Sequence, residues 1–178
     1  MWREVVGFAL VTTIAIGGDQ VNAQGESPRI RAEGASVRGL IDSGMVRSAT
    51  LRGVAEQLDN SNVVVYVRFA PCSGGVPACL AWAAAVANTR RLLIKIARFG
   101  HSPDELTALL AHELQHAAEV AADAQITDLA SFQQSFASRG WKHGTGFETG
   151  EAIDISRRVA AELTRSYGDA DLVAQRRP

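Results

Sequence analysis

The spacing of apolar positions first indicates helices. Between Val37 and Leu58, apolar side chains recur about every three or four residues, which is the spacing of one helix face. This segment predicts one or two helices with a break near Ser43-Gly44, and the polar run Asn60-Ser61-Asn62 ends it.

Two further segments predict strands. Val63–Phe69 is β-branched and aromatic and is closed by Pro71, and Arg91–Ile96 is apolar at alternate positions. Leu80–Ala87, which lies between them, has an ambiguous pattern. We expect a small antiparallel sheet.

Helical spacing returns in the second half of the chain. Ser102 is a predicted N-cap, Pro103 occupies the first helical position, and Glu105 is placed to complete a capping box. This helix is expected to run to about Ala122. Two more helices are predicted, at Leu129–Ser138, ended by Gly140, and at about Thr149–Arg165.

The N-terminus has the pattern of a signal peptide. Val5–Ile16 is a short apolar stretch behind Arg3, and Val21-Asn22-Ala23 resembles a cleavage site that would leave Gln24 as the first mature residue. A buried first helix or strand is the alternative, because Glu4 offsets the charge of Arg3. The predicted organisation is a signal peptide (1–23), a flexible lead-in (24–36) and a single α+β domain (37–178).

The amino-acid composition limits the kinds of partner that we expect the protein to bind. The chain has 178 residues, of which 47% are hydrophobic and 21% charged, as in a globular domain with one core. Lys and Arg number 18 against 19 Asp and Glu, so there is no basic footprint for nucleic acid. No apolar run reaches the roughly 18–20 residues that span a bilayer, and we expect no membrane association after signal removal.

The two cysteines give information about the cellular compartment of the protein. Cys72 and Cys79 flank the turn-like insert Ser-Gly-Gly-Val-Pro-Ala, a spacing that closes a loop. They would form a disulfide in an oxidising compartment and remain two buried thiols in the cytosol. Together with the signal peptide, this spacing predicts a secreted or periplasmic protein.

The pentapeptide His112-Glu113-Leu114-Gln115-His116, an HExxH motif, carries the candidate chemistry. On a helix, His112 and His116 project from one side a turn apart, so both can bind the same zinc ion. Glu113 lies about 100° round the helix, where it can act as the general base for a water at the metal. The apolar side of the helix comprises Leu106, Leu110, Leu114, Ala117 and Ala121, and the polar side adds Glu105, Glu119 and Asp123 to the two histidines.

This motif and its surroundings, over roughly residues 63–165, resemble the zincin superfamily of metallopeptidases. The resemblance implies a minimal zincin-like domain, a catalytic zinc and a peptide or protein substrate aligned along the Arg91–Ile96 strand. Metzincins are excluded, because Glu119 and Ala122 stand where they have glycine and a third histidine. The chain offers no second domain for the far wall of a cleft, so either the cleft is shallow or a protein partner completes it.

A catalytic zinc needs a third protein ligand. Zincins of the gluzincin type take a glutamate from a later helix, and the candidates are Glu148, Glu151 and Asp154. We predict Glu148, because it continues the inward stripe of Ala152, Ile155, Val159 and Leu163. Glu151 stays open as the alternative, since Gly150-Glu151-Ala152-Ile153 resembles the ligand stretch of thermolysin-like enzymes. Glu119 is a third rival, better placed to accept a hydrogen bond from His116 than to bind the metal.

Other polar and aromatic residues have weaker assignments. His143, in a predicted loop, could stabilise an oxyanion or bind substrate, or it could be an exposed histidine without a role. We assign no role to His101 and expect Trp82 and Trp141 to serve packing.

Two classes of function fit these residues. The first is a zinc-dependent hydrolase, expected to be a metallopeptidase, and a non-peptide substrate stays open. The second is a non-enzymatic exported module, stabilised by zinc and the disulfide, that binds a partner. Three protein ligands on the metal would favour catalysis and four would favour a structural site.

Overall fold

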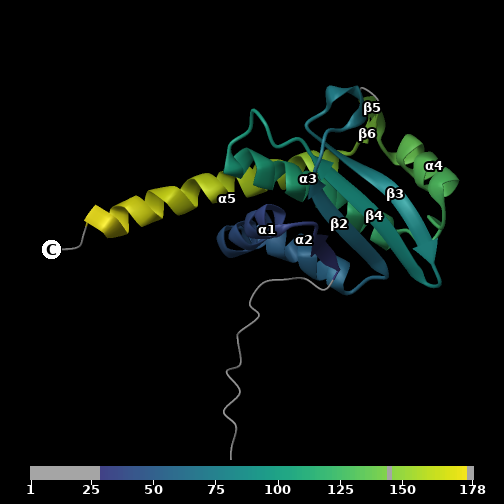
Figure 1. Ribbon diagram of the computed structural model, residues 1–178, viewed down its shortest axis with the longest axis horizontal. Coiled ribbons are helices and arrows are strands. Elements are labelled where there is room, and N and C mark those ends of the chain that lie inside the picture. Colours follow the sequence, from purple (N-terminus) through teal and green to yellow (C-terminus); the bar gives the residue numbers. More distant parts are fainter. Residues whose placement is uncertain (1–28, 144–145, 176–178) are drawn as a thin grey trace, which may run out of the picture.

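The structure is a computed structural model that describes the backbone of residues 29–143 and 146–175, with side chains from 29 to 142 and from 147 to 166. The predicted signal peptide, residues 1–23, lies outside the described residues. The described chain has an α+β fold in which five helices accompany a small sheet (Figure 1).

The main sheet has four strands in the order β1-β2-β4-β3. Their bounds are β1 Ile30–Ala32, β2 Val63–Phe69, β3 Ala78–Val86 and β4 Thr89–Ile96. The prediction of an antiparallel sheet is wrong for most of it: β1, β2 and β4 run parallel, and only β3 is antiparallel to β4. The helical crossover from β1 to β2 returns the chain in the same direction, which gives parallel pairing.

The first strand lies in the segment that we expected to be a flexible lead-in. Ile30 is fully buried and pairs with Val65, so residues from 30 onward belong to the sheet. A strand of three residues is too short to carry a periodic signal.

The helices are α1 Ala35–Arg47, α2 Ala49–Asp59, α3 Pro103–Ala122, α4 Leu129–Arg139 and α5 Gly150–Gln175. The break between α1 and α2 falls at Ser48, whose side chain accepts a hydrogen bond from the Leu51 N–H, and not at Ser43-Gly44. Gly44 serves packing instead, because a Cβ there would lie 2.7 Å from Leu51 and 2.8 Å from Thr107.

The core lies between one face of the sheet and the helices. Val65, Leu92 and Ile94 on the sheet and Leu110 and Leu114 on α3 are all fully buried. The stripe predicted for the last helix is also buried and packs against α3. In Figure 1, α1 and α2 lie towards the β2 side of the sheet, and α4 lies beyond β3.

The end of α3 is fixed by a buried arginine. The Arg90 guanidinium on β4 donates hydrogen bonds to carbonyl oxygens of Val120, Ala121, Asp123 and Ile126. A cation at a helix C-terminus satisfies the last carbonyl groups and complements the helix dipole. This contact ties the helix that carries the HExxH motif to the middle of the sheet.

Candidate metal centre

The helix α3 begins and ends where the sequence predicts. Ser102 and Glu105 form the capping box, with the Ser102 N–H donating to the Glu105 carboxylate at 2.7 Å. His112 and His116 then lie on successive turns, with their ring centroids 4.8 Å apart and their planes at 85°. The helix therefore presents both imidazoles on one side.

Glu148 joins the two histidines from another part of the chain. Its Oε2 lies 3.0 Å from Nε2 of His112. One ligand atom from each of Glu148, His112 and His116 lies within 4.8 Å of the others, so this group could hold a metal ion. Among the described residues, no other group of three or more histidine, cysteine or carboxylate side chains places its ligand atoms this close together.

The element that carries Glu148 differs from the expectation. The short hairpin of β5 (Trp141–His143) and β6 (Gly146–Glu148) ends at this residue, and α5 begins only at Gly150. Gly140 makes this path possible, because a Cβ there would overlap the Glu148 carbonyl oxygen. The helical stripe thus pointed to a residue of this group, although Glu148 lies on a strand before the helix.

The other candidates for third ligand lie elsewhere. Glu151 and Asp154 are exposed on α5, and neither belongs to the group of three. Glu119 turns its Oε2 to Nδ1 of His116 at 3.1 Å, as the sequence geometry indicates. That contact leaves Nε2 of His116 as the nitrogen available to a metal.

Thr149 completes this arrangement and was not identified from the sequence. Its hydroxyl donates to Glu119 Oε1 at 2.6 Å and accepts from the Ala152 N–H at 3.3 Å. A chain of hydrogen bonds therefore runs from the start of α5 through Glu119 to His116. The only sequence signal was a threonine at the position of a helix N-cap.

Glu113 lies beside the three grouped residues and is not part of their group. Burial raises the pKa of Glu113 to about 7, although the nearby His116 and His112 oppose this shift. The Leu80 backbone on β3 also hydrogen-bonds its carboxylate. A carboxyl group with a pKa near neutrality can both accept and return a proton.

The pKa of His112 is set by competing effects. Burial lowers it, but the hydrogen bond with Glu148 and the charges of Glu113 and Glu148 outweigh burial. The pKa of His112 is consequently raised from its ordinary value. The carboxylates thus favour a positive charge at this position, and a metal cation would satisfy the same preference.

Two cavities flank this centre. The larger, of about 330 Å³, and the smaller, of about 270 Å³, share Val76, Ala78, Glu113 and Glu148 in their linings. The larger cavity has an aromatic wall comprising Phe132 and Phe136 of α4 and Phe147 of β6. The described part of the chain therefore supplies an aromatic wall for this cavity.

The edge strand beside the centre is not the strand that we expected there. Arg91–Ile96 lies within β4, which pairs with β2 on one side and β3 on the other, so its backbone is fully engaged. The edge strand is β3, and its residues Ala78–Ala81 line the larger cavity. Leu80–Ala87, whose sequence pattern is ambiguous, thus lies in the edge position that we expected for Arg91–Ile96.

Cys72 and Cys79 form a disulfide at the rim of the cavities. The loop that it closes contains the short 3-10 turn Ser73–Gly75, in which Gly74 and Gly75 have positive φ. Val76 and Pro77 from the same loop line the smaller cavity. The cross-link constrains one wall of the candidate site.

The remaining aromatic and histidine residues divide in role. Trp82 packs near Phe132, with ring centroids 6.1 Å apart, in agreement with a packing role. Trp141 is 50% exposed and lines the smaller cavity, so it is more accessible than expected. His101 is half-buried beside the start of α3, and the side chain of His143 lies outside the described part.

Comparison with known proteins gives no relative. No family model, no curated protein and no solved structure matches the chain. None of the described helices is long and apolar enough to span a membrane.

Proposed function

We propose that this protein is an exported zinc-dependent hydrolase that cleaves peptide bonds. The observation that carries the proposal is the convergence of His112, His116 and Glu148 beside the buried carboxyl group of Glu113. Two of these side chains are one turn apart on α3, and the third comes from a separate hairpin. We infer that the fold is a minimal zincin-like domain.

The donor set fits zinc. Two imidazole nitrogens and one carboxylate oxygen are the protein ligands of many catalytic zinc sites, whereas Mg²⁺ and Ca²⁺ prefer oxygen ligands alone. Within the described residues the group contains three such side chains and no fourth. Three protein ligands leave a position for water, which supports catalysis over a purely structural site.

The residues of the chain have distinct tasks in the proposed reaction. Bound zinc would supply Lewis acidity, which polarises a carbonyl group and lowers the pKa of water. The Glu113 carboxylate accepts a proton from the attacking water and passes it to the leaving amine. Glu119, held by Thr149, keeps His116 oriented towards the centre.

The edge strand β3 is the proposed place for the substrate backbone. Its outer side has no partner strand in the described sheet, and Ala78–Ala81 line the larger cavity with Glu113. An extended peptide can add to such an edge by main-chain hydrogen bonds. This placement supports a peptide substrate. It assigns the substrate backbone to β3, whereas the resemblance places it along Arg91–Ile96 of β4.

The disulfide supports export. Disulfides persist in oxidising compartments and are rare in the cytosol. The Cys72–Cys79 pair therefore supports a secreted or periplasmic location for the mature protein.

Peptide hydrolysis by the zinc-loaded protein tests the proposal. Quenched fluorescent peptides of mixed sequence are incubated with the wild-type protein and with Glu113→Gln. We expect hydrolysis by the wild-type protein and a loss of about 10²- to 10⁴-fold in kcat for the variant, since the proton acceptor is gone. Glu151→Gln is the matched control, because that carboxylate is exposed and outside the group.

The outcome separates the two classes of function. Equal hydrolysis by the wild type and Glu113→Gln would contradict the assignment of the general base. Stoichiometric zinc without hydrolysis of any peptide would favour the non-enzymatic binding module.

A further inference from the structure

The face of the main sheet that points away from the helices is basic. Its accessible side chains are Arg31 of β1, Tyr66 and Arg68 of β2, and Arg91, Leu93 and Lys95 of β4, and these six residues define the open sheet face. Val64 of β2, the register partner of Arg91, lies on the same face and is buried. Arg31 and Arg91 are exposed and the other four are half-buried, whereas most of their strand neighbours on the opposite face are fully buried: Ile30, Val65, Val67, Leu92, Ile94 and Ile96.

The charge of this face does not follow from the composition. The whole chain has 18 basic and 19 acidic residues, so an even distribution would leave the face near neutrality. Among the described residues, Glu33 forms an ion pair with this face, 3.6 Å from Arg68. In the described part of the chain, Arg31, Arg91 and Lys95 have no ion pair within 4.0 Å.

The arrangement has a local energetic cost. Arg68 and Lys95 are register partners on adjacent strands, and like charges opposite each other destabilise a sheet. The Arg68 Nε is also buried without a hydrogen-bond partner among the described residues. Such conflicts between local rules and the fold are typical of functional surfaces.

One guanidinium of the face is held by an aromatic ring. The Arg31 guanidinium lies 5.8 Å from the centre of the Tyr66 ring and approaches the Tyr66 hydroxyl at 3.5 Å. Stacking on a ring reduces the freedom of a guanidinium and leaves its N–H donors available. A fork of such donors matches the geometry of a carboxylate.

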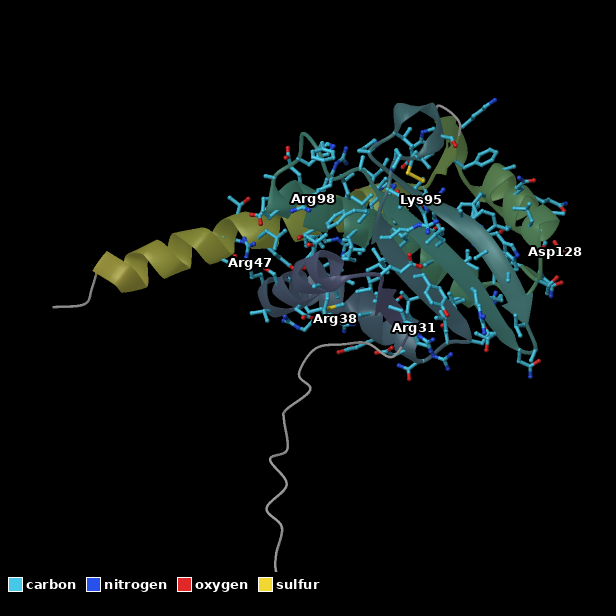
Figure 2. The ribbon with its side chains drawn as sticks, in the orientation of Figure 1. Arg31, Arg38, Arg47, Lys95, Arg98 and Asp128 are labelled. Carbon is cyan, nitrogen blue, oxygen red and sulfur yellow. A yellow bond between two sulfur atoms is a disulfide. The ribbon has the colours of Figure 1, made fainter. Side chains whose placement is uncertain are left out.

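The open sheet face continues into the candidate site. Lys95 lines the larger cavity together with Glu113, and its register partner on β3 is Cys79. Figure 2 shows Lys95 beside the disulfide and Arg31 towards the other end of the sheet. Basic side chains therefore extend from β1 to the wall of the cavity.

We propose that the open sheet face binds an acidic segment of the peptide substrate, outside the residues that flank the cleaved bond. This inference rests on the proposed function for its catalytic part. Charge complementarity favours a chain of carboxylates, and the continuity through Lys95 favours a segment of the molecule that enters the cavity. The substrate class is thus a peptide or protein with an acidic stretch next to its cleavage site.

Binding is measured by fluorescence anisotropy with a labelled peptide of glutamate and glycine and a matched peptide of glutamine and glycine. The test variant is Arg31→Gln with Arg91→Gln, because both side chains are exposed and can change without loss of the core. The control is Arg157→Gln with Arg158→Gln on α5, also exposed. We expect the glutamate peptide to bind the wild type and the control about tenfold or more tightly than the test variant at low salt, and to weaken as salt rises.

Three results would overturn the proposal. They are equal binding by wild type and test variant, equal binding of the glutamate and glutamine peptides, and binding of anionic vesicles or a sulfated polysaccharide in place of the glutamate peptide. The same titration with His112→Ala plus His116→Ala is expected to give unchanged affinity, because the face lies outside the metal centre. Failure of the zinc proposal would therefore not be mistaken for failure of the binding face.

Kinetics test the catalytic part. One cleavable peptide is extended with glutamates or with glutamines, and we expect the glutamate extension to lower KM about tenfold with kcat unchanged in the wild type. The difference should disappear in Arg31→Gln with Arg91→Gln. A glutamate extension that leaves KM unchanged in the wild type would refute an acidic substrate, even if the peptide is cleaved.

Discussion

Two regions of the molecule build the candidate metal centre in different ways. The main sheet with α1, α2 and α3, here called the framework, contributes His112, Glu113 and His116 from a helix that is buried in the core. The segment from Asp128 to Thr149, here called the arm, contributes Glu148, and among its described side chains only Phe136 and Thr149 are buried.

The two regions differ in what holds their candidate ligand residues in place. Apolar packing of α3 in the core sets the backbone position of the two histidines. The position of Glu148 instead depends on a few contacts: the close approach of Gly140 to its carbonyl, its own contact with His112, and the hydrogen bond from Thr149 to Glu119. Changes in the framework should therefore act mainly on global stability, and changes in the arm mainly on metal affinity.

The largest effect is expected in the framework. Leu110→Ala removes a fully buried side chain from α3 and should lower the free energy of unfolding by about 2–5 kcal/mol. Leu129→Ala, at a side chain of the arm that is 51% exposed, should change it by less than about 0.5 kcal/mol. Chemical denaturation of both variants measures this, and similar losses in both would remove the distinction between the regions.

The next effect is expected in the arm. Gly140→Ala places a methyl group against the Glu148 carbonyl, so the β5–β6 hairpin must shift. We expect zinc affinity to fall about 10- to 100-fold, the range found when groups that position a ligand are lost. Competition with a zinc chelator measures the affinity. Gly150→Ala is the control, because beyond its chain neighbours and the backbone of its own helix no atom lies within 4 Å of the new carbon. Equal affinities would contradict the role of Gly140.

A smaller effect is expected at the junction of arm and framework. Thr149→Val keeps the shape of the side chain but removes the hydroxyl that bonds Glu119 and the Ala152 N–H. Zinc affinity should fall by about tenfold, because His116 loses the support of an oriented Glu119. Thr149→Ser should retain near wild-type affinity. If both variants bind zinc alike, the hydroxyl does not support the centre.

The smallest effect concerns pH and the attachment of α5 to the framework. Burial raises the pKa of Glu162, but hydrogen bonds from Ser48 and Thr50 outweigh it, and the pKa of Glu162 is lowered overall. A depressed carboxyl pKa adds stability that is present above the ordinary value of 4.5 and is lost as pH falls through the folded value.

Glu162→Gln should accordingly lower the free energy of unfolding by about 1 kcal/mol at pH 7. The difference from the wild type should shrink as the pH falls below the ordinary value of 4.5 and through the lowered pKa of Glu162, because the wild-type carboxylate then protonates. Urea titrations over this range provide the measurement. A difference in the free energy of unfolding that does not depend on pH would show that the charge of Glu162 contributes nothing to stability.

How well the sequence predicts the structure also differs between the framework and the arm. The capping box, the two histidines on one helix face and the β2 strand depend on residues close in the sequence, and the sequence predicts each of them. The sheet order depends on pairing between distant strands, which periodicity does not encode. Periodicity therefore does not identify β3 as the edge strand beside the site.

The contacts of the arm were harder to predict. The helical stripe predicts Glu148, although this residue ends a strand of three residues. The link from Thr149 to Glu119 joins residues 30 positions apart, and neither residue alone signals the contact. Residues that orient a site through tertiary contacts carry little local pattern.

Zinc content measured by elemental analysis tests the central claim most directly. The wild type is compared with Glu148→Ala, with His112→Ala plus His116→Ala, and with Glu151→Ala as control. We predict about one zinc per chain in the wild type and in Glu151→Ala, and a loss of zinc in the other two variants. Absence of zinc from the wild type after reconstitution, or its retention when His112 and His116 are both replaced, would contradict the metal centre.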